Sequence, residues 1–388
     1  MRNSPIKRIL LWCPTGAGLH YGGAGTNAYR LYKSALPDGI QVTLACACPE
    51  QEDYSIFSEI VQIHRGSSQS HLSHLIFMCR AKQWLRMNAR HFDVFHGIDI
   101  FDNTIRPAIW AEQYGLSAVV KPAIYGAGLT TSKGIRRLLK LPEKRRELIS
   151  QLSGVVAISA EIEKEMLSYG VPHEIVKRIP NGVDAERFKP VSDERRGQLR
   201  ESFGWPADTF IVLFVGSITD RKRPDWITSA VKPLMDQHPN LRVVFVGPGR
   251  GGDYKSVLQE EVALQSWSNR IEFLGLREDV ENVYQAADVF CLPSMNEGMP
   301  NSVLEAMASG LPCLVTPVSG SKELVVDGSN GFHIDGPDAI RFRISEYMNK
   351  PELAIRQGEA ARQLVLDKYS TVRVFAEHLK LFESVVNT

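Results

Sequence analysis

The stretch that decides the fold is NEGMPNSVLEAMASGLP, residues 296–312. It carries two glutamates, Glu297 and Glu305, on either side of a proline, Pro300. Proline favours the approach to a helix rather than its interior, because it has a fixed φ and no N–H group. We therefore predict that Glu297 lies on a loop and that a helix begins near Asn301 and ends at the following glycine and proline. With this break, both carboxylates can line one cleft at the N-terminal end of the helix.

The start of this helix is expected to bind an anion. Its first backbone N–H groups have no acceptor within the helix, and the helix dipole places partial positive charge there. Carboxylates beside an anion site suit a ligand that carries hydroxyl groups as well as phosphate, such as a sugar joined to a phosphate. One alternative stays open for Glu305, because Ser302-x-x-Glu305 also fits a capping box, in which the glutamate only caps the helix.

The whole string E-G-M-P-N-x-x-x-E-A-M-A-x-G-x-P resembles the E-x7-E signature of the retaining glycosyltransferases of family 4. The resemblance implies an α/β fold of the GT-B type, with two Rossmann-like, doubly wound domains facing across a cleft. It also implies that Glu297 contacts the transferred sugar and that Glu305 binds the nucleotide ribose. The other substrate-binding residues that it implies within the motif are Gly298, Met299, Pro300 and Asn301.

Short apolar runs alternate with helical patterns along the chain, which predicts parallel sheets covered by helices on both faces. Such runs include KRILLWC at 7–13 and FIVLFVG at 210–216. We expect an N-terminal, acceptor-side domain over 1–183 and a C-terminal, nucleotide-sugar-binding domain over 184–370. The family's example implies that a last helix, over about 371–388, packs back onto the first domain.

Glycines dominate the segment that follows the first predicted strand. Within it, Gly23-Ala-Gly25-Thr-Asn-Ala28 matches G-x-G-x-x-A, the pattern of a dinucleotide site. An NAD site is disfavoured, because the motif begins well after the strand and no acidic residue ends the next strand. A glycine-rich loop at this place also resembles the family, in which it lets the backbone approach the donor diphosphate and the acceptor. Gly23 and Gly25 are therefore candidate substrate-binding residues, and a plain flexible turn is the alternative.

Further candidates follow later strands of the first domain. His96 and Tyr125 are expected at the carboxyl ends of two strands, the edge at which parallel sheets bind ligands. Where this chain has Tyr125, many family members carry a histidine that contacts the donor sugar; the tyrosine either donates a hydrogen bond to the sugar or only shapes the pocket. Residues 133–146 combine lysines and arginines with apolar side chains. They indicate peripheral contact with an anionic membrane or an acidic acceptor, with a solvated helix face as the alternative.

Four more candidates lie in or near the second domain. Asn181 belongs to a P-N-G-V-D turn that resembles the family's connection between domains, where it either faces the cleft or only shapes the turn. Arg221 and Lys222 follow the first strand of that domain, and a guanidinium with an ammonium can neutralise a diphosphate without a metal. Family members often have arginine at the position of Ser217, so Arg221 takes that role here. Arg277 lies in the segment whose backbone holds the nucleotide base in the family.

The composition is that of a globular protein, with 44% hydrophobic and 23% charged residues among 388. A formal net charge of +1 argues against nucleic acid as a partner. The chain has neither C-x-x-C nor H-E-x-x-H, so no metal site is predicted. No apolar run approaches about 18 residues and no leader pattern is found, so we expect a cytoplasmic protein. If the basic stretch binds lipid, the protein contacts the inner face of the membrane.

These observations predict an enzyme, a hexosyltransferase of class EC 2.4. It is expected to move a sugar, with retention of configuration, from a UDP- or GDP-type nucleotide sugar to a hydroxyl of a glycan, a lipid-linked or a small-molecule acceptor. No cofactor or metal is expected, and in the family the leaving phosphate takes the acceptor's proton, so a glycosidase-type carboxylate pair is not assigned. Two alternatives stay open: another GT-B enzyme (an epimerase or a phosphorylase) and a catalytically silent nucleotide-sugar-binding module.

Overall fold

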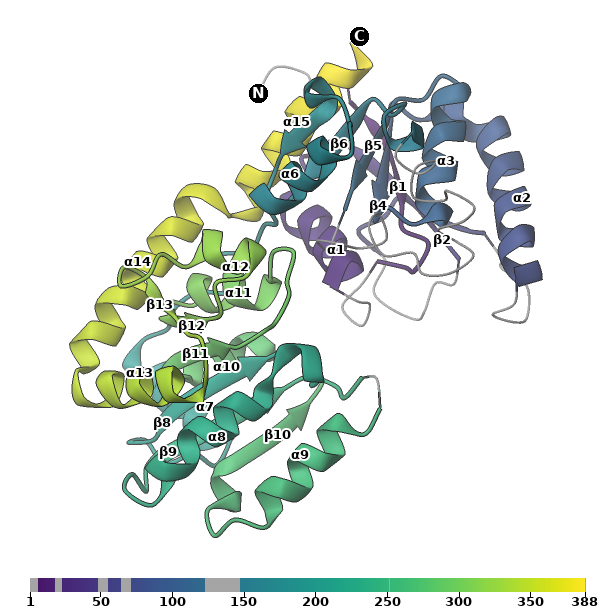
Figure 1. Ribbon diagram of the computed structural model, residues 1–388. Coiled ribbons are helices and arrows are strands. Elements are labelled where there is room, and N and C mark those ends of the chain that lie inside the picture. Colours follow the sequence, from purple (N-terminus) through teal and green to yellow (C-terminus); the bar gives the residue numbers. More distant parts are fainter. Residues whose placement is uncertain are drawn as a thin grey trace. The chain divides into compact units, whose positions relative to one another are not determined.

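The chain folds into two compact α/β units, seen here in a computed structural model (Figure 1). One unit comprises Met1–Gly182 together with Thr371–Thr388, and the other comprises Val183–Ser370. The boundary expected from the sequence lies one residue from this division. The structure describes six parts of the chain: 6–17, 23–47, 55–63, 71–122, 147–250 and 252–387. Within these parts, no helix is both long enough and apolar enough to cross a membrane.

The described part of the first unit is built on a parallel sheet of seven strands, in the order β3-β2-β1-β4-β5-β6-β7. The three strands β4, β5 and β6 are buried along their whole length, and β1 and β2 are buried except at their first residue, as expected for a sheet with both faces covered. The strands are β1 (Arg8–Trp12), β2 (Gln41–Cys46), β3 (Glu59–Gln62), β4 (Val94–Ile98), β5 (Ala118–Lys121), β6 (Gly154–Ala157) and β7 (Val176–Arg178). The α-helices of this unit include α1 (Gly23–Ala35), α2 (His71–Asn88), α3 (Asp102–Gln113), α6 (Ala160–Ser168) and α15 (Thr371–Val386).

The second unit repeats this plan with a parallel sheet of six described strands, in the order β10-β9-β8-β11-β12-β13. The strand order reverses between β8 and β11, and in open parallel sheets ligands bind at the carboxyl ends of the strands beside such a switch point. The strands are β8 (Phe210–Val215), β9 (Leu241–Val246), β10 (Ile271–Gly275), β11 (Val289–Leu292), β12 (Cys313–Val315) and β13 (Gly331–His333). The α-helices described in this unit are α7 (Asp193–Ser202), α8 (Pro224–Met235), α9 (Tyr254–Ala263), α10 (Val280–Ala286), α11 (Asn301–Ala308), α12 (Ser319–Leu324), α13 (Pro337–Asn349) and α14 (Pro351–Lys368).

The second unit begins and ends at one place. The backbone N–H of Val183, its first residue, donates to the carbonyl oxygen of Tyr369 at 2.8 Å, and Val183 forms a parallel β-bridge with Ser370. The chain then returns to the first unit as α15, which lies against α1 (Figure 1). The ring of Phe375 on α15 packs edge-on against Tyr32 on α1, with centroids 5.7 Å apart. The second unit is thus an insertion into the chain of the first.

The prediction that His96 ends a strand is wrong. The structure places His96 in the middle of β4, because the next residues, Gly97 and Ile98, continue the strand, and the histidine is completely buried. Its Nδ1 lies 2.7 Å from the hydroxyl of Tyr32, and its ring is 5.5 Å from that of His378 on α15. His96 therefore belongs to the packing between β4, α1 and α15.

We expect the free energy of unfolding to fall as the pH drops below about 6.5, the ordinary pKa of histidine. Burial, with smaller effects from His378 and Lys121, holds the pKa of His96 well below that value. Burial and the charge of Lys121 lower the pKa of His378 to about 3. Because the unfolded chain binds these protons and the folded chain does not, the stability is present above pH 6.5 and lost between there and the folded pKa.

Each histidine should contribute a slope of about 1.4 kcal/mol per pH unit in this window. Urea denaturation of the whole chain at several pH values between 7.5 and 4.5 measures the slope. His378→Gln should flatten it by one histidine's share, because the glutamine does not titrate. An identical slope in the variant would show that His378 is not held neutral in the folded protein.

Candidate functional site

The carboxyl ends of β8 and β11 bring the predicted basic pair and the first glutamate together. Arg221 and Lys222 lie on a 3-10 turn (Asp220–Lys222) after β8, and Glu297 lies on the loop after β11. The two loops also bond to each other through their backbones: the N–H of Met295 donates to the carbonyl oxygen of Arg221 at 2.8 Å. The guanidinium of Arg221 donates to the carbonyl oxygen of Asn296 as well. The site therefore forms at the switch point of the second sheet.

One oxygen of Glu297 receives three donors. Oε1 accepts hydrogen bonds from Ser294 Oγ at 2.8 Å and Arg221 Nη1 at 3.2 Å, and it lies 2.9 Å from Lys222 Nζ. The other oxygen, Oε2, accepts no hydrogen bond from the residues that the structure describes. One oxygen thus anchors the carboxylate to the basic pair while the other remains available to a ligand hydroxyl.

The Glu297 carboxylate is ionised despite its burial. Only 11% of its side chain is exposed, and burial by itself would raise its pKa. The charges of Lys222 and Arg221, and hydrogen bonds from Lys222 and Ser294, outweigh that effect and hold the pKa below the usual range. Its negative charge in turn keeps the two cations together before any anionic ligand arrives.

Glycines at the ends of three adjacent strands make room for this arrangement. Gly216, after β8, has a φ of +156°, and a Cβ there would come within 3.1 Å of the side chain of Lys222, which crosses over it. A Cβ on Gly247, after β9, would lie 2.1 Å from the carbonyl oxygen of Gly216. The N–H of Gly247 donates to the carbonyl oxygen of Gly275 at the end of β10. Glycine at these positions therefore lets Lys222 and the backbone of the neighbouring strand ends pack closely, because a Cβ would collide with them.

The helix that follows Glu297 forms as predicted. Helix α11 begins at Asn301 with Pro300 as its N-cap, and Gly310 with a φ of +77° follows its end. The start of the helix follows the Glu297 loop directly along the chain, and the helix dipole places partial positive charge at this end. The capping-box alternative is wrong: Ser302 lies inside the helix, and Glu305 instead accepts a hydrogen bond from the hydroxyl of Tyr284 at 2.9 Å.

The loop between the two glutamates is held by the start of α12. The carbonyl oxygen of Gly298 accepts hydrogen bonds from the N–H of Gly320 at 3.0 Å and from Ser319 Oγ at 3.3 Å. A Cβ on Gly320 would lie 2.3 Å from that carbonyl oxygen and 2.7 Å from the Cα of Met299. This close packing fixes the backbone of Gly298 and Met299, the two motif residues that precede Pro300.

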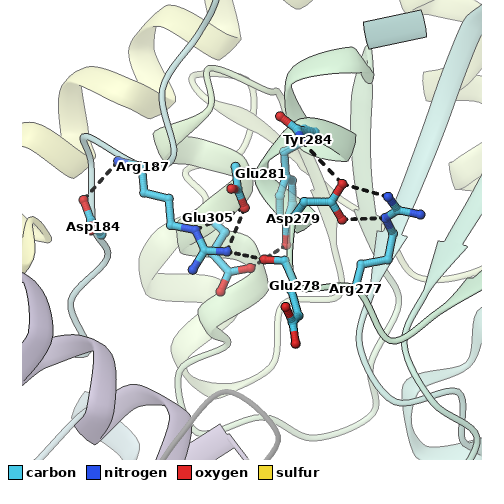
Figure 2. Close-up of polar contacts among 9 residues, drawn as sticks. Asp184, Arg187, Arg277, Glu278, Asp279, Glu281, Tyr284 and Glu305 are labelled. Atoms are coloured by element: carbon cyan, nitrogen blue, oxygen red, sulfur yellow. Dashed lines mark hydrogen bonds and ion pairs between the residues drawn. The ribbon is translucent and has the colours of Figure 1, made fainter. Parts of the chain in front are cut away.

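Figure 2 shows how the neighbouring polar residues of the second unit are arranged. The guanidinium of Arg187 contacts the carboxylate of Glu281 at 2.7 Å and donates to the carbonyl oxygen of Glu278 at 2.5 Å. Arg277 turns its side chain onto Asp279, with hydrogen bonds of 2.9 and 2.7 Å. The loop after β10 is therefore fixed from both sides, and the side chain of Arg277 forms an ion pair with Asp279.

The remaining candidates belong to the first unit. Gly23 and Gly25 form the first turn of α1, so the expected glycine loop is in fact the beginning of a helix at these two positions. Asn181 is buried near the end of this unit, with 6% of it exposed. Tyr125 and the basic stretch 133–146 lie outside the residues that the structure describes. Within the described residues, no group of three or more His, Cys, Asp or Glu is arranged to hold a metal ion.

Sequence reasoning missed Ser294 and Tyr284, which donate to the two glutamates. Ser294 is completely buried three residues before Glu297, and Thr316, after β12, donates to its carbonyl oxygen. Because a serine lies only three residues before Glu297, the sequence could have indicated a hydrogen-bond donor to this glutamate. Tyr284 lies far from Glu305 along the chain, and its pairing with α11 depends on the fold of the unit.

Two family models match the chain. Residues 195–364 match the glycosyl transferases group 1, and residues 21–187 match glycosyltransferase family 4. The chain belongs to glycosyltransferase family 4. The motif from Glu297 to Glu305 and the basic pair both lie within the matched regions of this family 4 chain.

Curated relatives of this family 4 chain carry transferase names. It is 32% identical over 208 residues to the "Putative glycosyltransferase EpsD" of Bacillus subtilis, covering 53% of the chain and 54% of that protein. It is 37% identical over 168 residues to an Escherichia coli protein named "UDP-Gal:alpha-D-GlcNAc-diphosphoundecaprenol alpha-1,3-galactosyltransferase", covering 42% of each. The chain spans about half the length of the curated relatives that it matches.

Solved structures show that the family 4 chain has the GT-B fold. Anabaena HepE, solved in complex with UDP and glucose, has a TM-score of 0.79 at 19% identity, covering 97% of this chain and 99% of HepE. WaaG, described as a glycosyltransferase of lipopolysaccharide biosynthesis, has a TM-score of 0.76 at 17% identity, covering 96% and 99%. The predicted pair of doubly wound, Rossmann-like sheets is thus confirmed.

Proposed function

We propose that this protein is a retaining glycosyltransferase that moves a sugar from a nucleoside diphosphate sugar to a hydroxyl acceptor. The observation that carries the proposal is the joining of Arg221, Lys222 and Glu297 at the switch point of the second sheet. Cations suit the diphosphate of such a donor, and a carboxylate oxygen suits the hydroxyls of its sugar. The names of the curated relatives support the same reaction class.

Arg221 and Lys222 have further N–H groups that can donate hydrogen bonds to a diphosphate. A lysine ammonium has three N–H donors, and Glu297 is the ion-pair partner of Lys222 within the described residues. Arg221 is about half exposed and uses one nitrogen of its guanidinium for Glu297 and Asn296. Negative charge grows on the leaving diphosphate as the bond to the sugar breaks. The N–H groups of Arg221 and Lys222 therefore stabilise the transition state more than they stabilise the bound nucleotide sugar.

In this proposal the two glutamates bind different parts of the nucleotide sugar. Glu297 Oε2 accepts a hydrogen bond from the transferred sugar, and Glu305 accepts hydrogen bonds from the ribose. The N–H groups at the start of α11 contribute to the diphosphate site. No metal or other cofactor takes part, because the two cations supply the charge that a metal would otherwise provide.

UDP sugars are the first donors to test. The HepE structures hold UDP, with glucose in one of them, and the Escherichia coli relative is named for UDP-Gal. The acceptors named for two relatives, a diphosphoundecaprenol-linked sugar and D-inositol 3-phosphate, both carry phosphate. We therefore place the acceptor hydroxyl on a phosphate-bearing lipid or small molecule.

A thermal-shift panel of UDP-, GDP- and ADP-sugars on the purified chain, with EDTA or with magnesium, tests the proposal. A ligand at 100 times its dissociation constant stabilises the folded state by about 2.7 kcal/mol, which is readily measured. A shift that is equal in EDTA and magnesium supports a metal-independent donor site. If no nucleotide sugar raised the thermal midpoint in either EDTA or magnesium, the proposal would be overturned.

Incubation of the bound donor with and without candidate acceptors then separates the alternatives. A transferase consumes donor when an acceptor hydroxyl is present, whereas an epimerase converts the donor alone and a phosphorylase needs phosphate. A silent binding module binds the donor and leaves it unchanged in every mixture.

A further inference from the structure

Tyr284 on α10 is held rigidly in the second unit. It is completely buried, and its ring packs edge-on against Phe188, with centroids 5.7 Å apart, and at a tilt against Phe290 of β11, with centroids 5.9 Å apart. Aromatic contacts of this kind fix the orientation of the ring. The position of the phenolic oxygen is therefore determined by the packing around it.

The phenolic oxygen meets the second glutamate of the motif. Tyr284 Oη lies 2.9 Å from Glu305 Oε2 (Figure 2). It also lies 3.1 Å from the carbonyl oxygen of Ser302, one helical turn before Glu305. Glu305 is itself 4% exposed. A buried carboxylate needs donors to keep its charge, and a hydrogen bond to a charged group is stronger than one between neutral groups.

The segment that supports Tyr284 also supports the loop after β10. Phe188 packs on the tyrosine ring, and its neighbour Arg187 holds the carbonyl oxygen of Glu278 and the carboxylate of Glu281 (Figure 2). Arg362 donates to the carbonyl oxygen of Phe188 at 3.1 Å and also to the last turn of α11 at Ala308. These contacts connect the segment that packs on Tyr284 to both α10 and α11.

We propose that Tyr284 is a positioning residue for nucleotide recognition: its hydroxyl holds the Glu305 carboxylate in the orientation in which it accepts hydrogen bonds from the ribose hydroxyls. This inference rests on the proposed function, because it takes the ligand to be a nucleoside diphosphate. Tyr284 acts through Glu305 and does not itself touch the ligand. The E-x7-E motif therefore depends on a third side chain that lies outside it.

Isothermal titration of the whole chain with UDP and with 2′,3′-dideoxyuridine diphosphate tests the inference. Tyr284→Phe removes only the hydroxyl, and we expect it to weaken UDP binding about tenfold. The dideoxy analogue lacks the hydroxyls that Glu305 would bind, so its affinity should be the same in the variant and the natural protein within twofold. A merely structural role would weaken both ligands equally, and that result would overturn the inference.

Tyr347→Phe is the matched control. Tyr347 is also completely buried in the second unit, and its hydroxyl donates to Gln357 at 2.5 Å. We expect this variant to lose stability without any change in the affinity for UDP. The thermal midpoints of both tyrosine variants, measured without ligand, show whether each remains folded at the temperature of the titration.

A double-mutant cycle gives a second, independent measurement. If Tyr284 acts through Glu305, then Tyr284→Phe should weaken UDP binding no further once Glu305→Gln is present. Additive losses, or an unchanged affinity in Tyr284→Phe alone, would overturn the inference and leave the proposed function standing. Failure of the natural protein to bind UDP, GDP or ADP would instead overturn the proposed function and this inference with it.

Discussion

Lys222→Ala should lower the rate of sugar transfer about 10- to 150-fold, which corresponds to about 1.5–3 kcal/mol of transition-state stabilisation. The ammonium of Lys222 lies 2.9 Å from Glu297 and crosses over Gly216, where a side chain would block it. In the variant, the leaving diphosphate loses one of its two cations, and Glu297 loses the nearer of its two counter-charges. Since the charge on the diphosphate grows as the bond breaks, turnover should fall more than donor affinity.

Steady-state kinetics with the donor found in the thermal-shift panel measure this effect. Lys189→Ala is the control, because Lys189 is an exposed lysine of the same unit that forms a surface ion pair with Glu186. We expect the control to keep its full rate, since exposed ion pairs contribute little. Turnover of Lys222→Ala within twofold of the natural protein would remove Lys222 from the site.

Glu297→Gln should change binding and turnover in opposite directions. The carboxylate now shares Oε1 between Arg221 and Lys222, so an incoming diphosphate competes with it for those cations. Glutamine keeps the size of the side chain and removes the charge. We therefore expect UDP to bind up to about tenfold more tightly and sugar transfer to slow by about 10- to 100-fold, because the sugar loses a charged acceptor.

Titration with UDP and turnover measurements on the same preparation give both quantities. Glu346→Gln is the matched control, because Glu346 also contacts two cations, Arg343 at 2.7 Å and Lys350 at 3.3 Å, on α13 and just after it. The control should leave both quantities unchanged. If Glu297→Gln weakens UDP binding, then the carboxylate does not compete with the diphosphate for Arg221 and Lys222. The proposal that Oε1 contacts these cations while Oε2 binds the sugar would then be wrong.

Much of the fold could be predicted from the sequence, because its strands are continuous apolar runs bounded by glycine and proline. The helix from Asn301 was predictable for a local reason, since Pro300 cannot continue a helix and Gly310 easily adopts a positive φ. The meeting of Lys222 with Glu297 followed from topology. Loops after neighbouring parallel strands meet at one edge of the sheet, even when they are distant along the chain.

Other features depend on packing that no local pattern contains. His96 reads as the polar end of a strand, yet α15 and α1 cover it, and those helices come from opposite ends of the described chain. The capping box at Ser302 was locally reasonable, but Tyr284 on another helix meets Glu305 instead. Gly23 and Gly25 read as a loop because glycine is a poor helix former, whereas the structure includes both in α1.

The return of α15 to the first unit determines the order in which the two units can fold during synthesis. Four side chains of α15 are buried in the first unit: Val374, Phe375, His378 and Phe382. The ribosome makes them only after the whole of 183–370. The second unit is continuous, with its ends bonded to each other, so it can complete its core as soon as it has emerged. The synthesis of the first unit therefore begins before that of the second unit, but its core is completed later, because Tyr32 on α1 and His96 on β4 lack their packing partners until α15 has been made.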